Sequence, residues 1–255
     1  MPAPELISPR TLTPYQQVWL RVGRTYGTWR VLSRLVGHSA TVRCFDGLPF
    51  FLNLRDPVGI QVLLKGFDEQ DERNQILGRL PPDSIILDVG ANHGVWARWL
   101  AYCYPQSTIY AFEPSAETCS FLRLNTEGFP NIYAIQAGCG DVAGDSYLSA
   151  EPATGLRHIA SHGEPVSIVR LDDFCSTLRR MDFIKIDVEG MELAVLSGAR
   201  TTLEKMRPVL LFEYAESTSG RYKINFSDLF EFLSEFDYCV ERIPKTNNYL
   251  AYVVP

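Results

Sequence analysis

"SIILDVGANHGVWARWL", residues 84–100, is the most informative segment of this chain. Apolar residues run into Asp88, a turn containing Gly90 and Gly94 follows, and an amphipathic segment opens at Val95. This is the pattern of a buried parallel strand that leads into a helix. Such a loop brings backbone N–H groups and a helix N-terminus together, where a polar or anionic ligand can bind.

Strands and helices alternate along the rest of the chain, which predicts an α/β protein with a doubly wound, mostly parallel sheet. Two final strands, at 238–243 and 248–254, are joined by a short turn and should form an antiparallel hairpin at the sheet edge. Residues 145–170 should be irregular or form a hairpin. The other strands are expected at 84–90, 107–114, 132–138, 182–190 and 208–214, and the helices at 68–80, 95–104, 116–127, 172–180, 192–205 and 227–236.

The front of the chain has a character of its own, with six arginines and one glutamate among residues 1–45. An apolar stripe at helical spacing from Tyr15 to Val36 predicts an amphipathic helix, and the runs "TVRCF" and "PFFLNL" predict a β-hairpin. The helix is interpreted as packing on the domain or on a second copy of the chain, in a homodimer. The alternative is a helix that binds a membrane surface or an acidic partner.

Composition limits the class of protein. The 255 residues are 46% hydrophobic and 21% charged, with a net charge of −6, so the basic footprint of a nucleic-acid binder is missing. The six cysteines form no CxxC pair, so we expect them to be small buried apolar side chains in a reducing compartment. The first residues lack a signal-peptide core and no apolar run is long enough for a transmembrane segment, so we expect a cytoplasmic protein.

A second acidic residue defines the expected ligand. Glu113 ends the strand that follows the glycine turn and lies 23 residues after Gly90, where a carboxylate can accept hydrogen bonds from both ribose hydroxyls. A dinucleotide fingerprint would need glycine at 92 and 95, but these positions hold Asn92 and Val95. The ligand should therefore carry a ribose without a pyrophosphate, and S-adenosylmethionine fits that description.

Five motifs, "LDVGANHG", "AFEP", "RLDDF", "IKIDVEGMELAVLSGA" and "LLFEYAE", resemble in order and spacing the FkbM family of S-adenosylmethionine-dependent methyltransferases. The resemblance implies a Rossmann-like class I methyltransferase fold with seven strands and O-methylation of a hydroxyl on a small molecule, sugar or natural product. The chain would then divide into an N-terminal helical and β extension, 1–66, and a methyltransferase domain, 67–255. Two features depart from the family: His93 stands where an apolar residue is usual, and the front helix lies outside the shared core.

The expected site residues gather at the ends of the predicted strands. Asp187 is the central candidate, contacting the methionine end of the cofactor or the acceptor oxygen, and Lys185 and His158 are weaker candidates for the general base. By the resemblance, Asp141 follows the third strand, where adenine contacts arise. The predicted cofactor-binding residues are Asp88, Gly90, Ala91, Asn92, Gly94, Glu113, Asp141 and Asp187.

The sequence also allows other interpretations of the site and of the function. Lys185 and Glu189 have an alternative interpretation as members of an ion-pair network that fixes the strand end. Asp187, Glu189 and Glu213 would suit Mg²⁺, but the sequence offers no histidine or repeated acid spacing beside them, so no metal is expected. A non-catalytic cofactor-binding or adaptor protein with the same fold is the alternative function, and an NAD-dependent oxidoreductase is disfavoured by the missing glycine.

Overall fold

The computed structural model describes residues 39–54, 56–66, 69–149 and 157–254, and the front helix expected between 13 and 37 lies outside them. The described residues contain a seven-stranded sheet in the order β12-β13-β11-β10-β3-β4-β5. Five of these strands run parallel to one another. They are β3 (Ile85–Val89), β4 (Thr108–Phe112), β5 (Ile132–Ile135), β10 (Phe183–Ile186) and β11 (Val209–Glu213).

The sheet ends in the expected hairpin. Strand β13 (Asn248–Val253) is antiparallel to both β11 and β12 (Tyr238–Arg242), and it lies between them. The order of the strands reverses at β3, because β4 and β5 lie on one side of it and β10 and β11 on the other. These observations confirm the predicted class I fold, a mostly parallel seven-stranded sheet with an antiparallel C-terminal hairpin.

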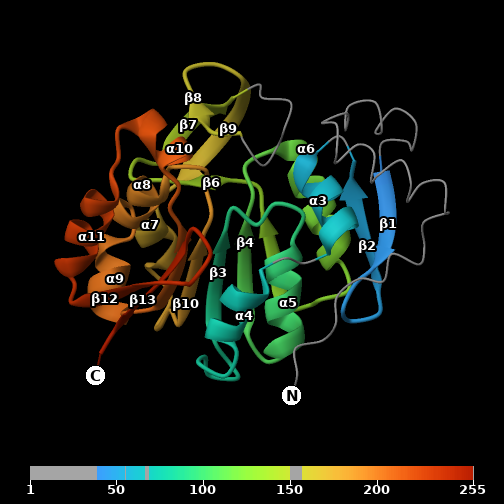
Figure 1. Ribbon diagram of the computed structural model, residues 1–255, viewed down its shortest axis with the longest axis horizontal. Coiled ribbons are helices and arrows are strands. Elements are labelled where there is room, and N and C mark those ends of the chain that lie inside the picture. The colour runs from blue at the N-terminus through green and yellow to red at the C-terminus, as the bar shows by residue number, and fades with distance from the viewer. Residues whose placement is uncertain (1–38, 55, 67–68, 150–156, 255) are drawn as a thin grey trace.

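Helices cover both faces of the sheet and produce two cores (Figure 1). Strand β3 shows the division, because Leu87 and Val89 belong to one core and Ile86 to the other, as alternation along a strand requires. One core includes side chains of α4 (Gln70–Ile76), α5 (Val95–Cys103) and α6 (Ala116–Thr126). The other includes side chains of α7 (Leu171–Cys175), α8 (Glu192–Ser197), α9 (Arg200–Met206) and α11 (Phe226–Ser234).

Residues 145–170 were expected to be irregular or to form a hairpin, and their described part contributes antiparallel strands to a second sheet. Its order is β6-β9-β7-β8, and it lies above the main sheet in Figure 1. The prediction of a single strand at 132–138 is wrong. Residues 132–135 form β5 and pair with β4, whereas Gly138 begins β6 and pairs with β9 in the second sheet. The strands are β6 (Gly138–Cys139), β7 (Gly144–Leu148), β8 (Ile159–Ala160) and β9 (Glu164–Val169).

The expected helix at 192–205 is also divided, into α8 and α9. The carboxylate of Asp172 accepts hydrogen bonds from the backbone N–H groups of Thr201 (3.0 Å) and Thr202 (2.8 Å), in the first turn of α9. Asp172 lies in α7, and it supplies acceptors to a helix 30 residues away in sequence. The short α10 (Glu216–Ser219) and the 3₁₀ turn Gly220–Tyr222 follow β11.

The predicted β-hairpin is present as β1 (Ser39–Arg43) paired with β2 (Pro49–Asn53), and it stands beside α6 in Figure 1. Helix α3 (Pro57–Lys65), which the sequence analysis did not predict, follows it and begins at the N-cap Asp56. Arg98 of α5 anchors the hairpin, because its guanidinium binds both carboxylate oxygens of Asp46 at 2.7 Å. Within the described part of the chain, every helix is too short or too polar to cross a lipid bilayer.

Candidate functional site

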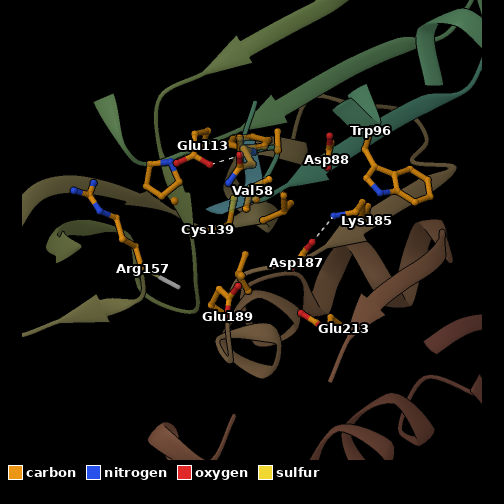
Figure 2. A pocket seen from close by; sticks show the side chains of 18 of the residues that line it. Val58, Asp88, Trp96, Glu113, Cys139, Arg157, Lys185, Asp187, Glu189 and Glu213 are labelled. Atoms are coloured by element: carbon orange, nitrogen blue, oxygen red, sulfur yellow. Dashed lines mark hydrogen bonds and ion pairs between the residues drawn. The ribbon is translucent and has the colours of Figure 1, made fainter. Parts of the chain in front are cut away.

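A cavity of about 510 Å³ opens at the carboxyl ends of the parallel strands. This is where ligands bind in open α/β sheets. It lies beside β3, where the strand order reverses, and Figure 2 shows carboxyl groups reaching it from several strand ends. The predicted site residues that line it are Asp88, Gly90, Ala91, Asn92, Glu113, His158, Lys185 and Asp187.

The glycine loop after β3 is held tightly between neighbouring strands. The backbone N–H groups of Gly90 and Ala91 both donate to the carbonyl of Phe112, at 3.0 and 2.8 Å. Gly90 has a φ of +83°, and a Cβ atom there would lie 1.8 Å from the backbone oxygen of Asp187. Only glycine fits this position, so the loop brings bare backbone to the cavity.

Glu113 presents a carboxyl group whose orientation is fixed by the backbone. Its Oε2 accepts from the N–H of Asn92 at 3.1 Å (Figure 2). Its Oε1 accepts from the N–H of Ser115 at 3.0 Å. Each carboxylate oxygen has a further lone pair, so the pair can still accept two hydrogen bonds from a ligand. Burial raises the pKa of Glu113 to about 7.

Asp88 lies on the cavity wall at the end of β3 with 0% of its surface exposed. Neither carboxylate oxygen has a hydrogen-bond partner among the described residues. Burial raises the pKa of Asp88 to about 6, although the nearby Lys185 opposes that shift. A buried acceptor without a donor is costly, and a ligand that supplies N–H or O–H groups would remove the cost.

Lys185 and Asp187 form an ion pair, with 2.9 Å between Nζ and Oδ2 (Figure 2). Burial by itself would lower the pKa of Lys185, but the carboxylates of Asp187, Asp88 and Glu69 outweigh it and raise that pKa well above its usual range. Lys185 therefore stays protonated at neutral pH and cannot accept a proton, which argues against it as the general base. Its structural role is to hold Asp187 at the cavity.

A strand was expected over 182–190, but β10 ends at Ile186, so Asp187 and Glu189 lie beyond it. Glu189 adopts a left-handed conformation with a φ of +56°, yet its side chain and that of Asp187 both reach the cavity. Burial, together with Asp187 and Glu213, raises the pKa of Glu189 to about 8. Burial and Asp187 also raise the pKa of Glu213.

Two predicted residues do not line the cavity. Asp141 is exposed in the turn between β6 and β7, and from this segment Gly138 and Cys139 line the cavity instead. Gly94 is the N-cap of α5, and a Cβ atom there would lie 2.6 Å from Leu122 Cδ1. The glycine at 94 is thus explained by the packing of α5 on α6.

His158 lines the cavity from the segment before β8. Its Nδ1 lies 3.2 Å from Ser149 Oγ and 3.4 Å from Arg221 Nη1. The ring is therefore held by neighbours on the second sheet and on the turn after α10, whereas Asp187 approaches from the main sheet. Within the described ranges, no group of three or more histidine, cysteine, aspartate or glutamate side chains is arranged to hold a metal ion.

Helix α3 forms a wall of the cavity that was not predicted, through Val58, Gln61 and Val62. The signal was present in "DPVGIQVLL", because Asp56 followed by Pro57 is a helix start and an apolar spacing follows it. Glu69 also lines the cavity and accepts a hydrogen bond from Trp96 Nε1.

Raised carboxyl pKa values make the stability of the ligand-free protein depend on pH. Burial is the main cause for Glu69, Glu113 and Glu192, with pKa values of about 7, and for Glu189, at about 8. The folded state therefore binds more protons than the unfolded state above pH 6.5, and stability should fall as pH rises from 6.5 to 8, by about 1–3 kcal/mol. Burial lowers the pKa of His93, so this residue makes stability rise with pH, chiefly below pH 6.5.

Urea unfolding at several pH values measures this dependence. Glu113→Gln and Glu189→Gln should each make the slope shallower, because each removes one of the responding groups. A stability that is constant or rises between pH 6.5 and 8 would contradict the raised pKa values.

Comparisons with known proteins agree with this geometry. A model of the methyltransferase FkbM domain matches residues 88–240, more than half of the chain. Methyltransferase 1 of Beauveria bassiana is 33% identical over 147 residues, which cover 46% of this chain and 59% of the relative. The hexuronic acid methyltransferase AglP of Haloferax volcanii is 27% identical over 149 residues, covering 56% of this chain and 61% of AglP.

A third relative, the 2-O-methyltransferase NoeI of Sinorhizobium fredii, is 26% identical over 189 residues, covering 64% of this chain and 76% of NoeI. The chain spans about three fifths of the length of the first two relatives. The family match includes the end of β3, the glycine loop, Glu113 and the Lys185–Asp187 pair. The chain belongs to the FkbM methyltransferase family.

Proposed function

We propose that the protein is an S-adenosylmethionine-dependent methyltransferase that transfers a methyl group to a hydroxyl of a small molecule, sugar or natural product. The observation that carries this proposal is Glu113, whose two oxygens are each fixed by one backbone N–H and line the cavity beside the glycine loop. Membership of the FkbM family supports the cofactor. The name of AglP, a hexuronic acid methyltransferase, supports a sugar as acceptor, and the name of NoeI, a 2-O-methyltransferase, supports transfer to oxygen.

The residues of the cavity fit this cofactor. Glu113 would accept hydrogen bonds from the two ribose hydroxyls, and the bare backbone at Gly90 allows a close approach. Asp88 has both carboxylate oxygens free of partners among the described residues, and the cofactor offers N–H and O–H donors. The bound cofactor would supply a methyl group on a positively charged sulfur, which the surrounding carboxylates attract.

Asp187 is our candidate for the group that acts on the acceptor. The ion pair with Lys185 fixes the orientation of its carboxylate, and the side chain retains 34% of its exposure, so it can reach a ligand in the cavity. A carboxylate held beside an acceptor hydroxyl can take its proton as the oxygen becomes the nucleophile. Glu189 and Glu213 lie on the same wall and could receive that proton from Asp187.

Two measurements test the proposal. Calorimetric titration should give binding of S-adenosylhomocysteine and much weaker binding of NADH, and preferential NADH binding would favour an oxidoreductase instead. Incubation with methyl-labelled S-adenosylmethionine and a panel of sugars and polyketides should then transfer label to a hydroxyl. Cofactor binding without transfer to any acceptor would support the non-catalytic alternative.

Glu113→Ala should weaken binding of S-adenosylhomocysteine by about 1–3 kcal/mol, because two hydrogen bonds to a charged group are lost. Calorimetry measures this change directly. Glu204→Ala is the matched control, since it removes the same charge from an exposed position away from the cavity, and its affinity should be unchanged. Equal affinity of Glu113→Ala and the natural protein would refute the ribose assignment.

A further inference from the structure

The hairpin β1–β2 lies before the range that the family model matches, yet it contacts the glycine loop through one buried side chain. His93, in that loop, is 1% exposed. The backbone N–H of Asn53, the last residue of β2, donates to His93 Nε2 at 3.3 Å. Since Nε2 accepts this bond, the proton of the neutral ring must reside on Nδ1.

The protonated nitrogen points to the next residue in a chain of hydrogen bonds. His93 Nδ1 donates to the side-chain oxygen of Asn92, which also accepts from the backbone N–H of His93 at 2.8 Å. The backbone N–H of Asn92 donates to Glu113 Oε2 at 3.1 Å. Contacts thus run without a break from β2, through His93 and Asn92, to the carboxylate that faces the cavity.

Asn92 needs such support because its backbone is left-handed, with a φ of +49°. Asparagine tolerates this region better than most residues, but an extended alternative would turn its N–H away from Glu113. The loop is fixed from a second side, since Asn125 Nδ2 donates to the carbonyl of His93 at 2.8 Å. The same amide pairs with Phe51 of β2 through both its oxygen (2.7 Å) and its nitrogen (2.9 Å).

The ring also has charged neighbours. Asp56, at the start of α3, places Oδ2 at 3.6 Å from His93 Nδ1, and Glu117 of α6 is the other acidic group that acts on it. Burial nevertheless lowers the pKa of His93, which keeps the ring neutral at physiological pH. The hydrogen bond at Nε2 requires this neutral ring, because a protonated Nε2 could not accept from Asn53.

We propose that His93 is a positioning residue, through which the hairpin β1–β2 holds Asn92 and Glu113 in the geometry that binds the cofactor. The inference rests on the proposed function, because Glu113 must contact the cofactor for its position to matter. It assigns a task to a histidine that departs from the family pattern and to a hairpin that lies outside the matched range.

Two substitutions of similar polarity separate the roles of the two ring nitrogens. His93→Asn keeps an N–H donor near the place of Nδ1, so it should bind S-adenosylhomocysteine within about twofold of the natural protein. His93→Gln keeps an acceptor near the place of Nε2 but lacks the donor to Asn92, so its Kd should rise about tenfold, as the loss of one such hydrogen bond implies. Calorimetry gives each Kd, and thermal unfolding gives each Tm.

Asp46→Asn is the matched control, because it weakens the attachment of the same hairpin to Arg98 without touching the loop. It should lower Tm and leave Kd within about twofold of the natural value. Equal Kd values for His93→Gln and His93→Asn, or an equal rise in Kd for Asp46→Asn, would overturn the positioning role. Failure of the natural protein itself to bind S-adenosylhomocysteine would instead refute the proposed function, and this inference with it.

Discussion

Asp187→Asn should lower kcat for methyl transfer by about 10²- to 10⁴-fold, the usual contribution of a positioned acid–base group. Asparagine keeps the size of the side chain but cannot take a proton and no longer attracts the positively charged sulfur. The buried Lys185 would lose its closest partner, but Asp88 and Glu69 still act on it, so the fold should persist. Single-turnover transfer of labelled methyl measures the rate, and calorimetry with S-adenosylhomocysteine measures cofactor binding.

Asp182→Asn is the control for this substitution. Asp182 precedes the same strand, β10, at the end remote from the cavity, and its carboxylate pairs with Arg180 at 3.2 Å. The substitution Asp182→Asn removes the same charge at the opposite end of β10, so kcat should change by less than about twofold. If Asp187→Asn reduced cofactor affinity by as large a factor as kcat, Asp187 would be a binding residue with no part in proton transfer.

Gly90→Ala should destabilise the protein by about 3 kcal/mol or more, the largest stability effect that we expect for any substitution in the glycine loop. The new methyl group would lie 1.8 Å from the backbone oxygen of Asp187, and neither backbone can move without breaking the pairing of β3 with β10. Urea unfolding measures the loss, and binding of S-adenosylhomocysteine should fall with it because the loop must shift.

Gly78→Ala separates this steric clash from the cost of the backbone conformation. Gly78 has a φ of +79°, close to that of Gly90, but no atom lies within 4 Å of the place its Cβ would take. Gly78→Ala should lower the free energy of unfolding by only about 1 kcal/mol, because alanine is less stable than glycine in a left-handed backbone conformation. Similar losses for the two variants would mean that conformation, rather than the contact with Asp187, explains the glycine at 90.

The central elements could be predicted because local pattern determines them. Strand β3, helix α5 and strand β4 all appear within two residues of their expected bounds, since a continuous apolar run or a helical stripe is sufficient to specify each. Glu113 was identified by its spacing from Gly90, which the βαβ unit fixes. The hairpin β1–β2 followed from its turn residues in the same way.

Long-range partners explain where prediction failed. Residues 132–138 form two strands because their second half pairs with β9, some 30 residues further on, and no local signal reports that pairing. Helices α8 and α9 are separate because Asp172 of the distant helix α7 accepts hydrogen bonds from the N-terminus of α9. In each case a tertiary contact outweighed the local preference.

The amino-acid pattern alone is sufficient to predict the alternating strands and helices of the main sheet, the glycine loop and the carboxylates at the strand ends. Only the tertiary structure decided what those groups can do: that Lys185 is a permanently charged partner of Asp187, that α3 closes one wall, and that His93 connects the hairpin to Glu113. The reason is physical. Periodicity and spacing are properties of neighbours along the chain, whereas protonation and hydrogen bonding depend on distances and burial, which arise only when remote segments pack together.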